Sequence, residues 1–413
     1  MRDRLLSSSE RLERLVVLTG ISGVNLGRVA EQAERVFGVP VYKFEDYLED
    51  EFKAPVYHIA ELLLMYYKST AERFLKVYRD ILGDAIASKQ GKAIIAMHLT
   101  YHRRRHIVPN PVLHLLREAA RRIVIVNYVD DYYHVLARLL DRVVKGRTPS
   151  VARGQVLDPI SVLYWRAADH SYATFHSVDG VEVIQFANKH SREMHTRLLA
   201  YALGEHYRGA SRYKKIYISH PITLVRRRAR EANEPLNKFK DALEIEEFKE
   251  VLERKCSEVI LFSPTSIDEL IASKGGVIDT VITRENRWPH PEGLHEYPYP
   301  VDLSRGEFDE YLYPVEETVK NPGYLKVVRS LIEAQIESRD LAYVTQADMI
   351  IAYRPTMYKT VHAGVETEMK TAAAQSKPVY AIIPEEDGMA EYTLFRLEYP
   401  LRSVEEVLSI LHC

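Results

Sequence analysis

The chain has 413 residues and a formal net charge of -2, so its length predicts two or three domains and no global basic field points to extended nucleic acid as a partner. Its hydrophobic content of 46% is typical of globular domains with real cores, and no apolar run is long enough to span a bilayer. Two cysteines, Cys256 and Cys413, lie far apart in the sequence, which argues against a disulfide scaffold and favours a reducing, cytoplasmic setting. Met1 is followed by no apolar signal-peptide run, and abundant Tyr, Arg and Glu favour a thermophilic source.

The first half opens with a short apolar strand, Leu15 to Thr19, followed by a glycine-containing loop and a helix that runs to about Phe37. Strand, glycine loop and helix form the context that a phosphate-binding loop needs. Aligned on Gly20 and Gly23, however, the loop has leucine where the phosphate-binding lysine belongs and lacks the hydroxyl that binds Mg²⁺. Arg28 could replace the lost charge, but it lies two positions after Leu26, which occupies the lysine position. The candidate residues of this degenerate loop are Gly20, Ser22, Gly23, Asn25, Gly27 and Arg28.

Strands and helices alternate through the rest of the first half, which predicts a doubly wound parallel sheet. The expected strands are residues 38–43, 93–99 and 123–128, and residues 56–88 are expected to form a long helical region. This spacing resembles the P-loop nucleotide kinases related to adenylate kinase over about the first 200 residues. The resemblance implies a kinase-like domain at residues 1–208, with Mg-ATP or another nucleotide as a possible ligand, although the degenerate loop favours loss of phosphoryl transfer. The run Arg103 to Arg105 could bind phosphate or form a solvated basic loop.

The second half, residues 213–413, predicts another α/β domain. Strands are expected at residues 216–219 and 257–262, with helices at 236–253, 324–346 and 403–411. Residues 264–323 are rich in Pro, Gly and aromatic side chains and are too long for a simple connection. They predict an insertion that could act as a lid or a dimer contact.

The most informative stretch is Ala347 to Pro384, which predicts a strand, a helix and a second strand in a βαβ unit. Ligands of parallel sheets sit outside the carboxyl ends of the strands, where Gly364, Glu366 and Glu368 fall. Either glutamate could simply face the positive end of the helix dipole. The alternative is a nucleophile for an anomeric carbon, whose transition state carries positive charge.

The segment Gly364 to Glu368, Gly-Val-Glu-Thr-Glu, resembles the active-site motif of the nucleoside 2-deoxyribosyltransferase family, and the 2'-deoxynucleoside 5'-phosphate N-hydrolases match best. Ser338 to Leu341 is similar to the family's helix before the strand, and Ile216 to Ser219 to its first strand. The resemblance implies a flavodoxin/Rossmann-like domain in which Glu368 attacks C1' of the sugar. It also implies that Asp340 is the second carboxyl group and that Tyr217 holds the nucleophile. The simple alternatives are a surface ion pair of Asp340 with Arg339 and an ordinary strand aromatic at Tyr217. Active sites of this family are often completed by a neighbouring subunit, so a homodimer or larger oligomer is expected.

The chain departs from the family where the phosphohydrolases hold the 5'-phosphate. His220 and Pro221 replace Gly-Ser, and His362 replaces a serine, so that pocket is either rebuilt or absent. Two histidines without a clear carboxylate partner do not make a convincing metal site, and none is expected. The candidate substrate-binding residues are Ser219, His220, Arg226, His362 and Gly364.

The sequence therefore predicts an enzyme that cleaves or transfers the N-glycosidic bond of a nucleoside or nucleotide and needs no cofactor for that reaction. One alternative is a nucleoside or nucleotide kinase, or an NTP-binding protein, that uses the first domain. The other is a nucleotide sensor without catalytic activity.

Overall fold

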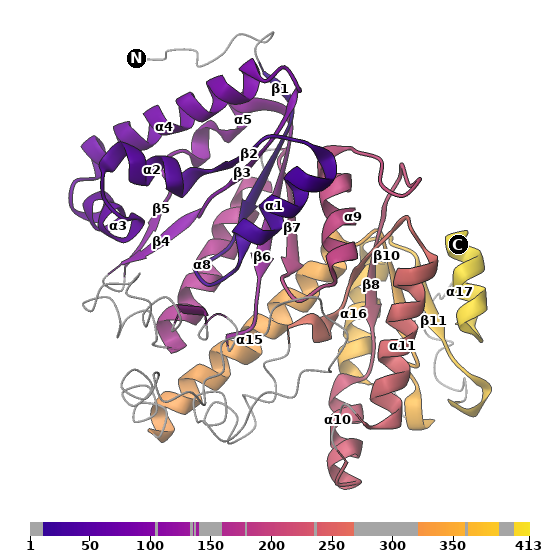
Figure 1. The fold of residues 1–413 in the computed structure, drawn as a ribbon. Helices are drawn as coiled ribbons and strands as arrows, with labels where there is room; N and C mark the ends of the chain where they lie inside the picture. The colour runs from indigo at the N-terminus through magenta and orange to yellow at the C-terminus, as the bar shows by residue number, and fades with distance from the viewer. Residues whose placement is uncertain are drawn as a thin grey trace. The chain divides into compact units, whose positions relative to one another are not determined.

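The structure, a computed structural model, describes residues 11–103, 106–132, 135, 138–139, 159–177, 180–234, 238–267, 321–359, 362–387 and 400–413 (Figure 1). The insertion expected at 264–323 therefore lies almost entirely outside the described residues. The chain divides into two compact units: the first ends at Asn188 and takes α15 (Pro322–Gln346) through Gln335, and the second begins at Lys189 and resumes at Ile336. The sequence predicts a boundary between residues 208 and 213, whereas this division assigns α9 (Arg192–Leu203) to the second unit.

The first unit contains a parallel five-stranded sheet with strand order β2-β3-β1-β6-β7. The central strand is buried on both faces, because every residue from Leu15 to Leu18 is inaccessible to solvent. The predicted parallel α/β class is thereby confirmed for this half. The strands are β1 (Leu12–Thr19), β2 (Val41–Lys43), β3 (Lys92–Ala96), β6 (Ala120–Val129) and β7 (Glu182–Ala187). The helices described in full are α1 (Leu26–Phe37), α2 (Phe44–Phe52), α3 (Val56–Met65), α4 (Tyr67–Ala87), α5 (Leu116–Ala119) and α8 (Pro159–Ser177).

Two local features of the first unit differ from the sequence prediction. The long helical region is broken at Tyr66, whose ψ of 53° is not helical, so α3 and α4 are separate helices. The supposed basic loop is part of an antiparallel hairpin, β4 (Thr100–Arg103) with β5 (His106–Pro109). Arg103 is only 4% exposed and forms an ion pair with Glu61 at 3.0 Å, so neither a solvated nor a phosphate-binding role fits it. Arg104 and Arg105 lie outside the described residues.

The second unit contains a parallel five-stranded sheet with strand order β12-β11-β10-β8-β9. Numbered along this unit alone, the order is 2-1-3-4-5, which is the flavodoxin-like doubly wound arrangement. The predicted parallel α/β class is thereby confirmed for this half too. The strands are β8 (Lys214–Ser219), β9 (Val259–Phe262), β10 (Met349–Tyr353), β11 (Val379–Ile382) and β12 (Pro400–Leu401). The helices beside α9 and α15 are α10 (Ile222–Glu231), α11 (Lys240–Lys255), α16 (Ala363–Ala374) and α17 (Val404–Leu411).

Helices pack on both faces of the second sheet. Tyr217 and Ser219 on β8 point to the face covered by α16, which contacts both β8 and β10. Tyr353 on β10 points to the opposite face and stacks on Phe248 of α11, with ring centroids 4.6 Å apart. Alternate residues along each strand therefore point to opposite faces of the sheet and contact different helices. Among the described residues, no helix is long and apolar enough to cross a membrane.

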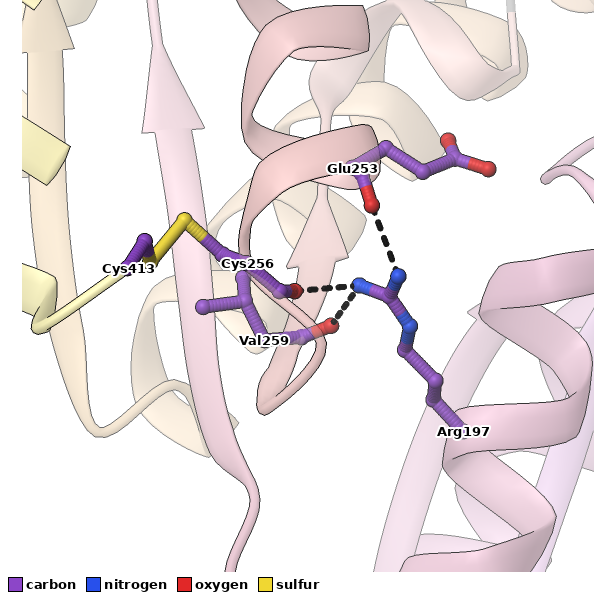
Figure 2. The surroundings of a disulfide bond; sticks show 5 residues. All are labelled: Arg197, Glu253, Cys256, Val259 and Cys413. Atoms are coloured by element: carbon purple, nitrogen blue, oxygen red, sulfur yellow. Dashed lines mark hydrogen bonds between the residues drawn. A yellow bond between two sulfur atoms is a disulfide. The ribbon is translucent and has the colours of Figure 1, made fainter. Parts of the chain in front are cut away.

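The two cysteines form a disulfide bond, Cys256–Cys413, which corrects the expectation drawn from their separation in the sequence (Figure 2). Their Cα atoms are 4.9 Å apart although their sequence separation is 157, because α17 packs beside α11 and Cys256 directly follows α11. Arg197 braces the same turn: its guanidinium donates to the carbonyl oxygens of Cys256 at 2.6 Å and Val259 at 3.0 Å. The end of α11 is thus tied covalently to the chain after α17 and by hydrogen bonds to α9.

Candidate active site

A carboxylate held by two hydroxyl groups lies at the carboxyl end of β8. The Tyr217 hydroxyl donates to Oε1 of Glu368 at 2.8 Å, and the Ser219 hydroxyl donates to Oε2. Tyr217 and Ser219 are two positions apart on a strand, so both side chains point to the same face, where α16 presents Glu368. The hydrogen bond expected between Tyr217 and Glu368 is present, whereas Ser219, expected to bind substrate, contacts the carboxylate itself.

The register of α16 separates the two glutamates that the sequence could not distinguish. Glu368 falls on the side of the helix that also carries the buried Val365 and Met369. Glu366 points away and forms an i,i+4 ion pair with Lys370. Of the two glutamates, Glu368 is therefore the one whose carboxylate lies at the edge of the sheet.

The Glu368 carboxyl group has a strongly raised pKa. Burial and then the negative charge of Asp340 raise the pKa of Glu368 from 4.5 to about 8, although the hydrogen bonds from Ser219 and Tyr217 act in the opposite direction. The side chain is only half-buried by surface area, so a ligand could still reach it. Glu368 consequently ionises close to the pH at which enzymes operate, as expected of an acid-base or nucleophilic group.

Asp340 is the second carboxyl group of the cluster, and Arg339 is its partner. The Arg339 guanidinium donates to Oδ1 of Asp340 from Nε at 3.3 Å and from a terminal nitrogen at 3.1 Å. The arginine is only 6% exposed, so the simple alternative of a surface ion pair is wrong. Burial raises the pKa of Asp340, although the charge of Arg339 and its hydrogen bond oppose that shift.

The remaining predicted substrate-binding residues lie directly after β8, on α10 and at the start of α16. His220 directly follows β8 and is 5% exposed. Arg226 lies on α10, a helix that the sequence did not predict. His362 precedes α16, and its ring makes a long 3.5 Å contact with the Met357 carbonyl oxygen. Gly364 is exposed on the first turn of α16, with open space around the position of a Cβ.

The predicted phosphate loop belongs to the first unit, and side chains from outside the loop hold it by donating hydrogen bonds to its carbonyl oxygens. His98 Nδ1 donates to the Gly20 carbonyl oxygen at 2.6 Å, and Arg138 donates to the Gly23 carbonyl oxygen at 2.8 Å. The Ser22 hydroxyl lies 3.5 Å from His98 Nε2. A Cβ at Gly20 would come within 2.6 Å of a backbone oxygen, so this position requires glycine.

The amide groups of the same loop are partly used as well. The Val24 amide donates to Ile21 at 3.1 Å, and the Leu26 amide donates to Val24 at 2.9 Å. A phosphate loop needs such amides directed at its ligand. Asn25 precedes α1 without capping it through its side chain, and Gly27 and Arg28 lie in the first turn of that helix.

Two charged residues that lie beside the predicted site residues Asp340 and His220 were missed by the sequence analysis. Arg339 is one, because its pairing with Asp340 was considered only as a surface contact. Lys249 is another: its ammonium group donates to the Thr265 hydroxyl at 2.9 Å and lies 3.4 Å from the Ser263 hydroxyl. No sequence pattern marked Lys249, because a lysine on an amphipathic helix is usually solvated. Among the residues that the structure describes, no three His, Cys, Asp or Glu side chains are grouped to hold a metal ion.

Comparison with known proteins adds no argument about what this chain does. No protein-family description matches the chain, and no curated protein matches it. Among solved structures, a shikimate kinase from Bacteroides thetaiotaomicron aligns with 16% identity, 46% of this chain and 98% of that chain covered, and a TM-score of 0.30. A similarity at that level carries no argument about activity, which has to come from the site itself.

Proposed function

We propose that the second unit cleaves the N-glycosidic bond of a nucleoside or nucleotide, with Glu368 as the nucleophile. The observation that supports this proposal best is the pair of hydroxyl groups, from Tyr217 and Ser219, that hold one oxygen each of the Glu368 carboxylate. Such a clamp fixes the rotamer of a nucleophile before the substrate arrives. The resemblance of Gly364 to Glu368 to the deoxyribosyltransferase motif supports the same chemistry.

The proposed reaction has two steps. In the first, a Glu368 oxygen attacks C1' of the sugar, and the C1'–N bond breaks with its electron pair moving to the base. The base takes up a proton from solvent as it leaves, and Asp340, which is paired with Arg339, can accept a hydrogen bond from a hydroxyl group of the sugar. In the second step, water or another base attacks C1', the Glu368–C1' bond breaks to restore the carboxylate, and the proton lost by the attacking group passes to solvent.

The first experiment measures free base released from ribonucleosides, deoxyribonucleosides and their 5'-monophosphates by chromatography. We expect wild type to release base from at least one class and Glu368→Gln to lose at least a hundredfold in rate. Glu366→Gln is the matched control, because Glu366 lies two residues away on the same helix and is paired with Lys370. We expect its rate to stay within about twofold of wild type, since such an exposed pair contributes little.

A trapped intermediate would identify the nucleophile directly. Protein quenched during turnover should carry a sugar-sized mass increase on the peptide that contains Glu368. Release of base that survives Glu368→Gln would refute the nucleophile. Absence of release from every substrate, together with a ligand-induced thermal shift that Glu368→Gln leaves unchanged, would favour a nucleotide sensor instead.

Nucleotide binding by the first unit is a second candidate. Its support is topological: the glycine loop follows β1, where the strand order reverses between β1 and β3. The internal hydrogen bonds of the loop argue against phosphoryl transfer. Calorimetric titration with Mg-ATP tests it, and binding that Arg28→Ala weakens would support it.

A further inference from the structure

A buried arginine, Arg339, orients the second carboxyl group of the proposed active site. Its guanidinium donates twice to Oδ1 of Asp340, from Nε at 3.3 Å and from a terminal nitrogen at 3.1 Å. The same terminal nitrogen donates to the Pro264 carbonyl oxygen at 3.2 Å, which fixes the arginine to the chain that follows β9. Oδ1 of Asp340 is therefore occupied and held in one direction.

The other oxygen of Asp340, Oδ2, is left for a ligand. Within the described part of the chain no group donates a hydrogen bond to Oδ2. The side chain of Asp340 keeps 14% of its accessible surface, so a ligand can reach this oxygen. A carboxylate with one oxygen fixed and the other accessible can accept a hydrogen bond from a ligand in a defined direction.

Helix α15 carries this ion pair to the face of the sheet where Glu368 lies. Tyr343 follows the pair by one helical turn and is fully buried, with its ring centroid 6.3 Å from that of Tyr217 and 5.5 Å from that of Phe262. Tyr217 and Phe262 are register partners on β8 and β9, so both side chains point to one face. Tyr217 donates to Glu368 from that face, and Asp340 therefore lies on the same side of the sheet as the proposed nucleophile.

Arg339 also controls the charge of the cluster. Among the described residues, the charged and titratable groups that face Asp340 are Arg339, Glu368 and Tyr217. Burial raises the pKa of Asp340, and the charge and hydrogen bonds of Arg339 oppose that increase. Burial and then the charge of Asp340 raise the pKa of Glu368, whereas the charge of Arg339 lowers it. Without the arginine, both carboxyl groups would ionise only at higher pH.

We propose that Arg339 is a positioning residue of the glycosidic reaction, which holds Asp340 as an ionised acceptor for a hydroxyl group of the sugar. The inference rests on the proposed function and adds the residue that orients the sugar subsite. Arg339 acts through Asp340 and takes no part in breaking the bond. Arginine suits this role because its planar fork presents N–H groups in a fixed geometry, whereas lysine offers a compact charge on a flexible stem.

Substitutions of Arg339 separate positioning from packing. At pH values where both carboxyl groups are ionised, Arg339→Gln should lower kcat/KM for base release about 10- to 100-fold, the effect of losing a hydrogen bond to a charged group. In the Asp340→Asn background the same substitution should cost less than about threefold, because the carboxylate that it orients is already absent. Equal losses in both backgrounds would indicate a packing role and overturn the inference.

The pH profile gives a second readout. The rising limb of kcat/KM should move to higher pH in Arg339→Gln, whereas Arg339→Lys keeps the positive charge and should keep the limb of wild type with a lower plateau. If Arg339→Gln does not fold, Arg339→Lys carries the test, and a plateau equal to that of wild type overturns the inference. Arg103→Gln is the matched control, because Arg103 is 4% exposed and paired with Glu61 at 3.0 Å but belongs to the first unit. Its pH profile should match wild type.

The ionisation of Asp340 can be followed without turnover. Carboxyl carbon NMR of aspartate-labelled protein, with the Asp340 signal identified by its loss in Asp340→Asn, should show titration at higher pH in Arg339→Gln than in wild type. This result without base release by wild type would support the charge role of Arg339 and refute the proposed reaction. Base release by wild type with an unchanged Asp340 titration would refute the inference and leave the reaction standing.

Discussion

Tyr217 donates a hydrogen bond of 2.8 Å to Glu368, although 151 residues separate them in the chain. The bond exists because β10 pairs with β8, and the helix after β10 returns over the end of β8. Tyr217 keeps its proton there, since burial and then the charge of Glu368 raise its pKa. This tyrosine is therefore a permanent donor to the carboxylate.

Tyr217→Phe tests the value of this bond. Loss of a hydrogen bond to a charged group is expected to lower kcat/KM for base release about 10- to 100-fold, with the phenyl ring still filling the core position. Tyr353→Phe is a matched control, because the Tyr353 hydroxyl also donates to a carboxylate, Glu244, at 3.1 Å. The control should retain nearly full activity, and equal losses in both variants would indicate a general packing effect.

The pH dependence of activity follows from the raised pKa of Glu368. Since the nucleophile must be ionised, kcat/KM should rise with pH and level off above the pKa of about 8. Asp340→Asn removes a charge that raises this pKa, so the residual activity should rise at lower pH. A profile that is flat between pH 6 and pH 9 would contradict the assignment.

Stability should depend on pH through the same group. The folded pKa of Glu368 is raised from 4.5 to about 8, so its stabilising contribution is complete below pH 4.5 and is lost as pH rises through 8. Glu368→Gln should therefore gain stability relative to wild type across that range, by at most about 4 to 5 kcal/mol. Urea denaturation at pH 5 and pH 8.5 measures this difference, and an equal effect at both pH values would refute it.

The disulfide Cys256–Cys413 closes a loop with a sequence separation of 157 residues. Its removal should lower the free energy of unfolding by about 2 to 4 kcal/mol, because the reduced unfolded chain gains conformational freedom. Cys413→Ser is the suitable variant, since Cys413 is exposed whereas Cys256 is 1% exposed and its truncation would leave a cavity. Reducing agent should destabilise wild type but not Cys413→Ser, and two titratable thiols in the native oxidised protein would show that the bond is absent.

Asp169 makes the stability of the first unit fall as pH rises from about 4 to 6. Burial raises its pKa from 3.8 to about 6, while hydrogen bonds from Thr100 at 3.1 Å and Asn127 at 2.8 Å oppose the shift. Its stabilising contribution is therefore complete below pH 3.8 and is lost as pH rises through 6. Asp169→Asn should remove this loss, which amounts to at most about 3 kcal/mol, once the Asn127 amide turns to accept a hydrogen bond. The exposed Asp80→Asn is the control, and denaturation at pH 4.5 and pH 7.5 should separate the two variants.

Local patterns in the sequence were sufficient for most of the strands. An unbroken apolar run predicts a strand buried on both faces, and the run Met349 to Tyr353 has the same bounds in the structure. The same reasoning placed Glu368 at the carboxyl end of a parallel sheet, and the family resemblance paired it with Tyr217. The hairpin β4–β5 and the helix α10 escaped prediction, because their short, charged sequences carry no clear period.

Only the tertiary structure decided which of these residues act together. The sequence left Glu366 and Glu368 equivalent, and the register of α16 against β8 separated them. No pattern in the sequence indicated that Cys256 and Cys413 pair, and the packing of α17 beside α11 brings them together in a disulfide bond. Local periodicity reports whether a side chain is buried, but its partners depend on which strands and helices become neighbours. The sequence by itself therefore determined the parallel α/β class and the candidate carboxylates, and the fold determined their contacts, charge states and isolation from solvent.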